Sequence, residues 1–365
     1  GEAAEIVLFL LSTMTIVEIL NNNGCFDFLS QLLKTRNSKR MLWTLGIITF
    51  LISANLDNLT TTVMMLTMMH EVVPSRRQRM IFGSAIVIAA NTGGALTVIG
   101  NPEGLVLWNI GAVSATNFSM SLIIPCIVAW ALPTWMLGRM LPNRVDTEWV
   151  IMPYRGDDTN LNTWQRLVML FVGIGGLWFI PTFHNITKLS PFLGALCVLS
   201  VLWIVNEIFN HKLMNADQMI QRRTPRVLQY GVIQMMLYVM GVMLALGVVK
   251  ETGAMKLLWN FLQENVNNVW IYGVIAGFVS SVLDTFATAM SFIQIKQNVE
   301  MNDIYYKVIA FCVMCGGNVL AIGSMSGIAL LKMERMHIGW YFRNVGWKCV
   351  LGTAVGFVVL MLANL

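Results

Sequence analysis

Apolar segments long enough to cross a lipid bilayer dominate this sequence and constrain its fold more than any other feature. They lie near residues 119–138, 166–181, 189–208, 227–248 and 346–364, parted by short polar loops. A spanning helix needs about 20 apolar residues, and continuous runs of this kind differ from the alternating pattern of a β-barrel. Only 12% of the residues are charged, too few for the surface of a soluble enzyme or a nucleic-acid-binding protein. The sequence therefore predicts an all-α polytopic membrane protein.

Basic residues are distributed unevenly and indicate the orientation of the chain. Of the 24 lysines and arginines, 19 fall in five clusters that alternate spanning would bring to one side of the membrane. By the positive-inside rule this side is cytoplasmic, and the net charge of +5 needs no nucleic acid as a partner. The clusters run from Lys34 to Arg40, Arg76 to Arg79, Arg139 to Arg166, Lys212 to Arg226, and Lys332 to Lys348.

Two short apolar arms, residues 41–55 and 59–72, lie between two clusters that this orientation puts on the same side. Each arm would be about 22 Å long as a helix, against a hydrocarbon core of about 30 Å. We therefore predict a helical hairpin that enters the membrane from the cytoplasmic side and returns, with its tip at residues 53–60. Two short complete spans are the alternative.

The sequence also repeats itself. Residues 93–104 (GGALTVIGNPEG) align without gaps on residues 316–327 (GGNVLAIGSMSG), and Leu56-Asp57 matches Leu283-Asp284. The second copy predicts another hairpin over about 269–298 with Asp284 at its tip, flanked by few basic residues. The two repeats are therefore expected to be inverted relative to each other in the membrane.

These repeats divide the chain into a first repeat (1–141), a cytoplasmic linker (142–165) and a second repeat (166–365). The second repeat has three apolar segments before its hairpin, whereas the first has a single one near residues 5–20. We therefore expect two further helices, roughly 60–80 residues, ahead of Gly1.

Both hairpin tips carry an acid within apolar sequence. Asn and Thr residues surround Asp57, and Ser and Thr residues surround Asp284, with no basic neighbour close by in the sequence. Because an ionised carboxylate is costly inside a membrane, we interpret both acids as functional. Oxygen donors beside a carboxylate suit a small hard cation such as Na⁺. The alternative is that the hydroxyls cap half-helices while the acids sit in water-filled crevices.

A glycine-rich break follows each hairpin and predicts further oxygen ligands. Gly93-Gly94 and Gly100-Asn101-Pro102 interrupt a helix, and Pro102 suits the first turn of the next one. Freed backbone carbonyls at such breaks could face an ion. Glycines that only allow close helix packing are the alternative. The side chains that could join the carbonyls are Asn91, Thr97, Asn101, Glu103, Asn318, Ser324 and Ser326.

A carboxylate in such a place can hold either a proton or a Na⁺, and competition between them at an alternately exposed site gives exchange. Glu18, in the apolar run near residues 5–20, either relays protons or pairs with a polar neighbour. Cys312 and Cys315 form a CxxC that we interpret as helix packing. The four histidines are scattered, so we expect no metal cluster and no cofactor beside the transported ions.

Four segments resemble the NhaD-type Na⁺/H⁺ antiporters of the ion transporter superfamily. They are residues 14–18 (MTIVE), 50–62 (FLISANLDNLTTT), 88–95 (IAANTGGA) and 322–327 (IGSMSG), and the resemblance covers nearly the whole chain. It implies a bacterial plasma-membrane antiporter, not an enzyme, that exchanges Na⁺ or Li⁺ for H⁺ as a homodimer. It also implies a scaffold domain and a transport domain, built from hairpins and broken helices, that shifts like an elevator.

The resemblance carries Asp57, Asn58, Asn91 and Asp284 over as ion-site residues. The chain departs from the family pattern in three places. Asn101 stands where the family has Asp, with Glu103 two residues on. Thr285 stands where Asn is usual, and Asn318 replaces a small residue. A displaced carboxylate at Glu103 would preserve the charge of the site, while Gly-Asn-Pro also resembles anion-carrying branches of the superfamily.

Two other functions stay open. A transporter of a small carboxylate or oxyanion, coupled to Na⁺ or not, is expected to have Ser-Asn-Thr motifs and few buried acids at its tips, whereas each tip here carries an Asp. An intramembrane aspartyl protease would use the two aspartates as acid and base. The Gly-x-Gly-Asp motif that such enzymes share does not occur around Asp57 or Asp284.

Overall fold

The computed structural model describes residues 2–26, 28–29, 33, 35–145, 161–210, 232–266, 268–296 and 300–364. Within these ranges the regular structure is entirely helical, which confirms the all-α prediction. The predicted basic cluster at 212–226 and positions 146–160 of the predicted linker lie outside the described residues.

Six helical stretches of the described chain are long and apolar enough to cross a membrane. Large hydrophobic side chains on their outer faces are exposed, such as Phe171 at 77% and Trp178 at 64%, as lipid-facing surfaces require. The prediction of a polytopic membrane protein is thereby confirmed. The six stretches are Ala4–Asn22, Ala115–Gly138, Thr163–Thr187, Pro191–Asn210, Ile304–Met333 and Ile338–Leu362.

The chain forms two compact units. Unit 1 comprises residues 1–34 and 149–241, and unit 2 comprises residues 35–148 and 242–365. Each unit takes residues from both predicted repeats, so the units are not the repeats, and the division at 141 and 166 stays a prediction.

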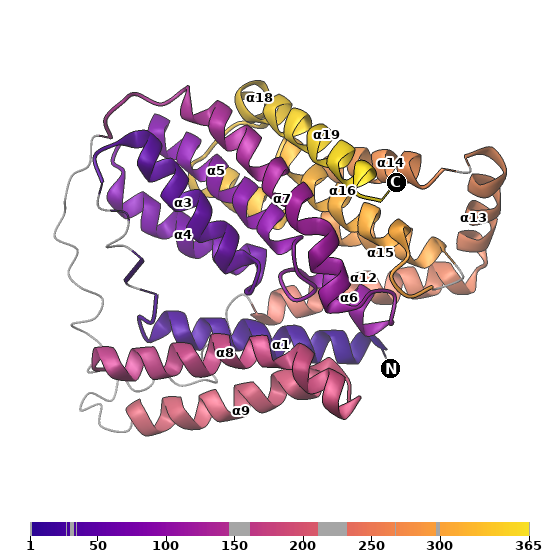
Figure 1. The fold of residues 1–365 in the computed structure, drawn as a ribbon, viewed down its shortest axis with the longest axis horizontal. Coiled ribbons are helices and arrows are strands. Elements are labelled where there is room, and N and C mark those ends of the chain that lie inside the picture. Colours follow the sequence, from indigo (N-terminus) through magenta and orange to yellow (C-terminus); the bar gives the residue numbers. More distant parts are fainter. Residues whose placement is uncertain are drawn as a thin grey trace. The chain divides into compact units, whose positions relative to one another are not determined.

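Unit 1 contains α1 (Glu2–Asn22), α8 (Thr163–Thr187) and α9 (Pro191–Asn210), which pack against one another (Figure 1). Three buried amides join α1 to α9. Asn23 Nδ2 donates to Asn206 Oδ1 at 2.8 Å, and Asn210 Nδ2 donates to Asn23 Oδ1 at 3.0 Å. Helix α12 (Val232–Glu251) begins in this unit and ends in unit 2.

Unit 2 contains two helix pairs and two broken helices, and these hold the candidate site. The first helix pair is α3 (Ser38–Ser53) and α4 (Asn58–Val72), and the second is α14 (Val269–Val282) and α15 (Thr285–Ile295). The first broken helix is α5 (Arg76–Gly94) and α6 (Pro102–Asn109). The second is α16 (Ile304–Leu320) and α17 (Met325–Met333).

Within unit 2 each helix pair packs on its own broken helix, α3 on α5 and α14 on α16 (Figure 1). Helix α19 packs on α7, where the small residues Gly352 and Gly356 meet Pro133 and the carbonyl of Pro125. The remaining elements of this unit are α7 (Ala115–Gly138), α13 (Ala254–Asn265), α18 (Ile338–Tyr341), the π-helical turn Phe342–Gly346 and α19 (Trp347–Leu362).

Two glycines allow the helix pairs to approach the broken helices closely. A Cβ on Gly93 of α5 would lie 2.3 Å from the backbone oxygen of Phe50 in α3. A Cβ on Gly316 of α16 would lie 2.3 Å from the backbone oxygen of Gly277 in α14. No real Cβ makes so short a contact, so only glycine fits at either place. Close packing and helix breaking are therefore both present, rather than alternatives.

Serine hydroxyls reinforce the same two contacts. Ser53 Oγ donates to the backbone oxygen of Ala90 at 2.6 Å, and Ser280 Oγ donates to that of Val313 at 2.6 Å. Both serines are fully buried near the ends of the first helices of their pairs. The two halves of unit 2 thus share the same local construction.

Candidate functional site

The predicted tip acids cap the helices that follow them. Asp57 Oδ2 accepts a hydrogen bond from the backbone N–H of Thr60 at 3.0 Å and from its hydroxyl at 3.3 Å. Asp284 Oδ2 accepts from the backbone N–H of Ala287 at 3.1 Å. In the alternative drawn from the sequence, neighbouring hydroxyls had the capping role. The acids take it instead, because a carboxylate satisfies free N–H groups and the positive helix end at once.

The second segments of the two broken helices begin in the same way. Asn101 Oδ1 accepts from the backbone N–H of Gly104 at 2.7 Å. Ser324 Oγ accepts from the backbone N–H of Gly327 at 3.1 Å. All four N-terminal caps are therefore residues that the sequence singled out for the ion site.

A chain of buried amides links α4, α5, α16 and the start of α17. Asn58 Nδ2 donates to Asn91 Oδ1 at 3.1 Å. Asn91 Nδ2 in turn donates to Asn318 Oδ1 at 2.8 Å and to Ser324 Oγ at 3.0 Å. Asn91 therefore holds α4, α16 and the start of α17 together. Its Nδ2 donates two hydrogen bonds and its Oδ1 accepts one.

Glu103 lies where α6 packs against α15, the two segments that the amides do not link. It lies in the first turn of α6 and is 2% exposed. Its carboxyl group lies near Thr285, because α6 packs against α15, and it is subject to charge repulsion from Asp284 and Asp57. The first broken helix thus packs against the second helix pair. Together with the amides, this contact makes the four helix starts converge.

Several buried oxygen atoms of this region have no hydrogen-bond partner among the residues that the structure describes. Asp57 Oδ1 and Glu103 Oε2 are the carboxyl oxygens among them. Such atoms are costly unless a ligand or proton satisfies them, so they are available to a cation. The hydroxyls of this kind are those of Thr61, Thr62, Thr288 and Ser326.

Two contacts brace the tips against the breaks. Thr97 Oγ1 donates to the backbone oxygen of Ala54 in the first tip and accepts from the N–H of Gly100 at 3.1 Å. In the second half, the backbone N–H of Thr285 donates to the oxygen of Gly323 at 2.8 Å. Thr97 is therefore a brace as well as a candidate ligand.

We call Asp57, Asn58, Asn91, Asn101 and Glu103 the first half-site, and Asp284, Thr285, Asn318, Ser324 and Ser326 the second half-site. The contacts above join the two half-sites within unit 2. Glu18 lies in α1 of unit 1, and its role as a proton relay stays a prediction. The described part of the chain contains no group of three or more His, Cys, Asp or Glu side chains arranged to hold a metal ion.

The hydrogen bonds of Ser53 and Ser280 to the backbone of the broken helices were not predicted from the sequence. Ser53 and Ser280 differ by the same offset, 227, as the two tip acids, so the repeat itself carried the signal. From the sequence, Asn318 was expected to be one more oxygen ligand. In the structure its side-chain oxygen accepts from Asn91, and its backbone oxygen accepts from the Tyr341 hydroxyl at 3.0 Å.

Acids at converging helix starts, within a polytopic helical membrane protein, are an arrangement typical of secondary transporters with discontinuous helices. The family model described as "Citrate transporter" matches residues 2–316, and the chain belongs to this family within the ion transporter superfamily. The proteins of this family are transporters rather than enzymes. It also confirms the predicted superfamily.

Similarity to individual proteins extends along the whole chain. "Sodium/proton antiporter 1" of Arabidopsis thaliana is 31% identical over 369 residues, which are 99% of this chain and 62% of that protein. "Sodium/proton antiporter 2" of the same plant is 28% identical, over 99% of this chain and 86% of its own length. The "Na(+)/H(+) antiporter NhaD" of Vibrio parahaemolyticus is 26% identical, over 99% and 89%. The chain thus spans less than two thirds of the first of these relatives.

Proposed function

We propose that this chain exchanges Na⁺, or Li⁺, for H⁺ across a membrane, with Asp57, Glu103 and Asp284 binding cation and proton competitively. The observation that carries the proposal is the meeting of four helix starts that carry acids, among which Asp57 and Glu103 each have a buried oxygen without a partner among the described residues. The names of the relatives, which are sodium/proton antiporters, support the same choice of ions.

The charge of the site favours one small cation. Each helix N-terminus contributes a positive charge of about 0.5, so four of them offset roughly two of the three negative charges. About one negative charge remains, which a bound Na⁺ or a proton can neutralise. Oxygen atoms of Asp57, Glu103 and the nearby hydroxyls are ligands of the type that Na⁺ prefers.

We further propose that the two repeats are inverted relative to each other and that unit 2 carries both re-entrant hairpins. Gly93 and Gly316 make equivalent contacts in the two halves, and so do Ser53 and Ser280, which supports the repeats. Helices α3, α4, α14 and α15 have 16, 15, 14 and 11 residues, or roughly 16–24 Å, which is shorter than the hydrocarbon core of about 30 Å. This length supports hairpins that enter and return.

Unit 2 then corresponds to the transport domain of an elevator-like mechanism, and unit 1 to part of its scaffold. The homodimer, the bacterial plasma membrane and the cytoplasmic entry of the first hairpin are proposals of the same kind, resting on the family resemblance and on the distribution of basic residues. Single-cysteine accessibility from each side of the membrane, read at exposed positions such as Lys332 and Glu300, tests the orientation.

A small carboxylate is the second candidate substrate, because the matching family model is described as a citrate transporter and helix N-termini attract anions. Here, however, the four N-termini are already capped by side chains of the chain itself. Buried Asp57 and Glu103, together with half-buried Asp284, would also repel a carboxylate. These features favour the cation.

Proton flux in proteoliposomes tests the proposal. Protein is reconstituted with an internal pH-sensitive dye, and Na⁺, Li⁺, K⁺ or citrate is added outside. Na⁺ or Li⁺ should drive proton movement in the opposite direction, while K⁺ should not. Absence of Na⁺-driven and Li⁺-driven flux between about pH 6.5 and 9 would refute exchange, since carboxylates at such a site must lose protons in this range for the cation to compete. Uptake of labelled citrate would support the second candidate.

A further inference from the structure

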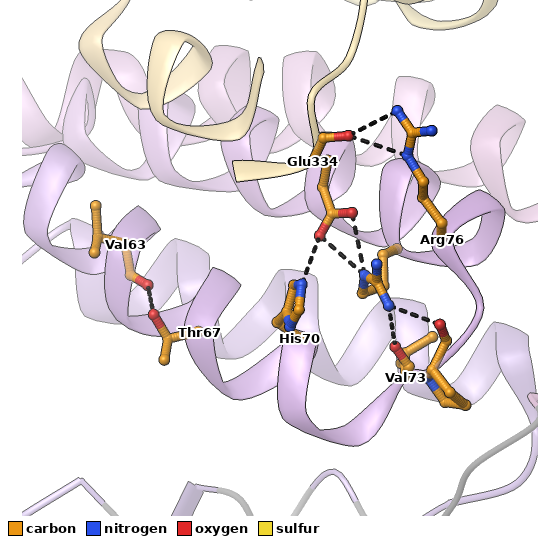
Figure 2. Close-up of polar contacts among 8 residues, drawn as sticks. Val63, Thr67, His70, Val73, Arg76 and Glu334 are labelled. Atoms are coloured by element: carbon orange, nitrogen blue, oxygen red, sulfur yellow. Dashed lines mark hydrogen bonds and ion pairs between the residues drawn. The ribbon is translucent and has the colours of Figure 1, made fainter. Parts of the chain in front are cut away.

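Glu334 is a buried acid at the end of α17 whose charge and backbone are both held by arginines. It is 3% exposed. Its Oε1 and Oε2 accept from Arg79 Nε at 3.0 and 3.1 Å. Its backbone oxygen accepts from Arg76 Nε at 3.2 Å and Nη2 at 3.1 Å (Figure 2). His70 Nε2, in the last turn of α4, lies 3.8 Å from Oε1.

The same arginine fixes the turn between α4 and α5. Arg79 Nη1 donates to the backbone oxygens of Val73 and Pro74, at 3.2 and 2.7 Å. One guanidinium group therefore joins this turn to the end of α17. A planar group with several fixed donors can do so, whereas an ammonium group cannot match this geometry.

The opposite end of α17 is held by the opposite end of α5. Asn91, near the end of α5, donates to Ser324, the cap of α17. Twelve residues separate Arg79 from Asn91, about 18 Å of helix, and ten separate Ser324 from Glu334, about 15 Å. Since α17 also packs on α5, the two run antiparallel with contacts at both ends of α17.

In the other half, the residues that follow α6 are joined to the residue ahead of α16 by hydrogen bonds between uncharged groups. The backbone N–H of Asn302, ahead of α16, donates to the oxygen of Ala112 at 2.8 Å. Asn302 Oδ1 accepts from the N–H and the hydroxyl of Ser114, at 2.9 and 3.1 Å. Each broken helix is thus tied, after its second segment, to the turn that precedes the other broken helix. The tie after α17 is an ion pair.

We propose that Glu334 is a positioning residue for the ion site. Bound to Arg79, it sets where α17 lies along α5, and thereby where Ser324 and Ser326 at the other end of α17 face the acids. The inference rests on the proposed exchange at this site. It gives Glu334 no contact with the ion, because it acts through the helix.

Exchange kinetics give the first test. Glu334→Gln keeps the size of the side chain and removes its charge, and should raise the Na⁺ concentration for half-maximal exchange about ten-fold with a maximal rate within about two-fold. Glu300→Gln, at an exposed glutamate, is the matched control and should behave like the parent. A half-saturating concentration for Glu334→Gln within about two-fold of the parent overturns the inference.

A labelling experiment separates this inference from the proposed function. Ser326 is fully buried, and Cys197 is the exposed one of the six cysteines. In a Ser326→Cys, Cys197→Ser chain, adding Glu334→Gln should speed maleimide labelling about ten-fold, because the start of α17 is released. An unchanged rate overturns the inference whether or not the protein exchanges ions. If the parent shows no exchange but labelling is accelerated, only the proposed function fails.

Arg79→Lys covers the case in which Glu334→Gln does not reach the membrane. It keeps a cation beside Glu334 but cannot reach both carboxylate oxygens and the Val73 carbonyl together. Labelling at least about three-fold faster than in the parent is expected. A rate equal to that of the parent overturns the inference.

Discussion

The two half-sites of unit 2 have the same backbone construction and different side-chain chemistry. In both, a serine and a glycine fix the helix pair on its broken helix, and a tip aspartate caps the next helix. The first half-site carries two acids, Asp57 and Glu103, both buried. The second carries one acid, half-buried Asp284, with hydroxyls at Thr285, Ser324 and Ser326.

This difference separates what the two halves must share, the close helix contacts, from what can differ between them, the oxygen donors. Close helix contacts need glycine in both halves, because no other residue fits against the facing carbonyl. The oxygen donors do not have to match, because an ion site needs only a total charge and enough ligands. Most of the negative charge therefore lies in the first half-site.

The largest effects are expected at the tip acids. Asp57→Asn and Asp284→Asn should each lower Na⁺-driven proton flux at least about 100-fold, because each removes a charge from the binding step. Both variants should still fold, since Asn caps a helix as well as Asp does. Flux in proteoliposomes and thermal unfolding in detergent measure the two properties.

The comparison breaks if the two variants differ. Parent-like flux in Asp284→Asn would confine binding to the first half-site. Parent-like flux in Asp57→Asn would move binding away from it.

A smaller effect is expected at the second acid of the first half-site. Glu103→Gln should raise the half-saturating Na⁺ concentration about ten-fold, because one of three acids is neutralised. Adding Asn101→Asp, which retains a cap for α6, should bring the value back to within about three-fold of the parent. Titration of flux with Na⁺ gives both values. If the double variant is no better than Glu103→Gln, charge at these two positions is not interchangeable.

The smallest effects are expected at the paired serines. Ser53→Ala and Ser280→Ala each remove one buried hydrogen bond and should lower the free energy of unfolding by about 1 kcal/mol. The two losses should be equal, with flux within about two-fold of the parent in both variants. Thermal unfolding of each variant beside the parent measures this. A loss in one variant several times that in the other would show that the two halves are not built alike.

Much of the fold was predictable because its signals are local. Apolar runs located five of the six spanning stretches, all but Ile304–Met333, and Gly-Asn-Pro located the start of α6 at Pro102. The repeat in sequence brought Asp57 and Asp284 forward as a pair. Residue type and spacing were sufficient for each of these predictions.

Contacts between segments far apart in sequence were not predictable. Asn91 with Asn318, and Arg79 with Glu334, join residues more than 200 positions apart. Nothing in the order of residues indicates which polar side chains will meet across a helix interface. The approach of Glu103 to Thr285 likewise depends on how α6 packs against α15.

The four capped helix starts have a consequence for identifying the transported ion. Side chains that hold these starts in place are also candidate ligands, so an ion that binds them stabilises the folded protein by mass action, by about 2.7 kcal/mol at one hundred times its dissociation constant. The melting temperature should then rise with the logarithm of the concentration of the true cargo and ignore other salts at equal ionic strength. A thermal shift in detergent could rank Na⁺, Li⁺, K⁺ and citrate before any vesicle is made.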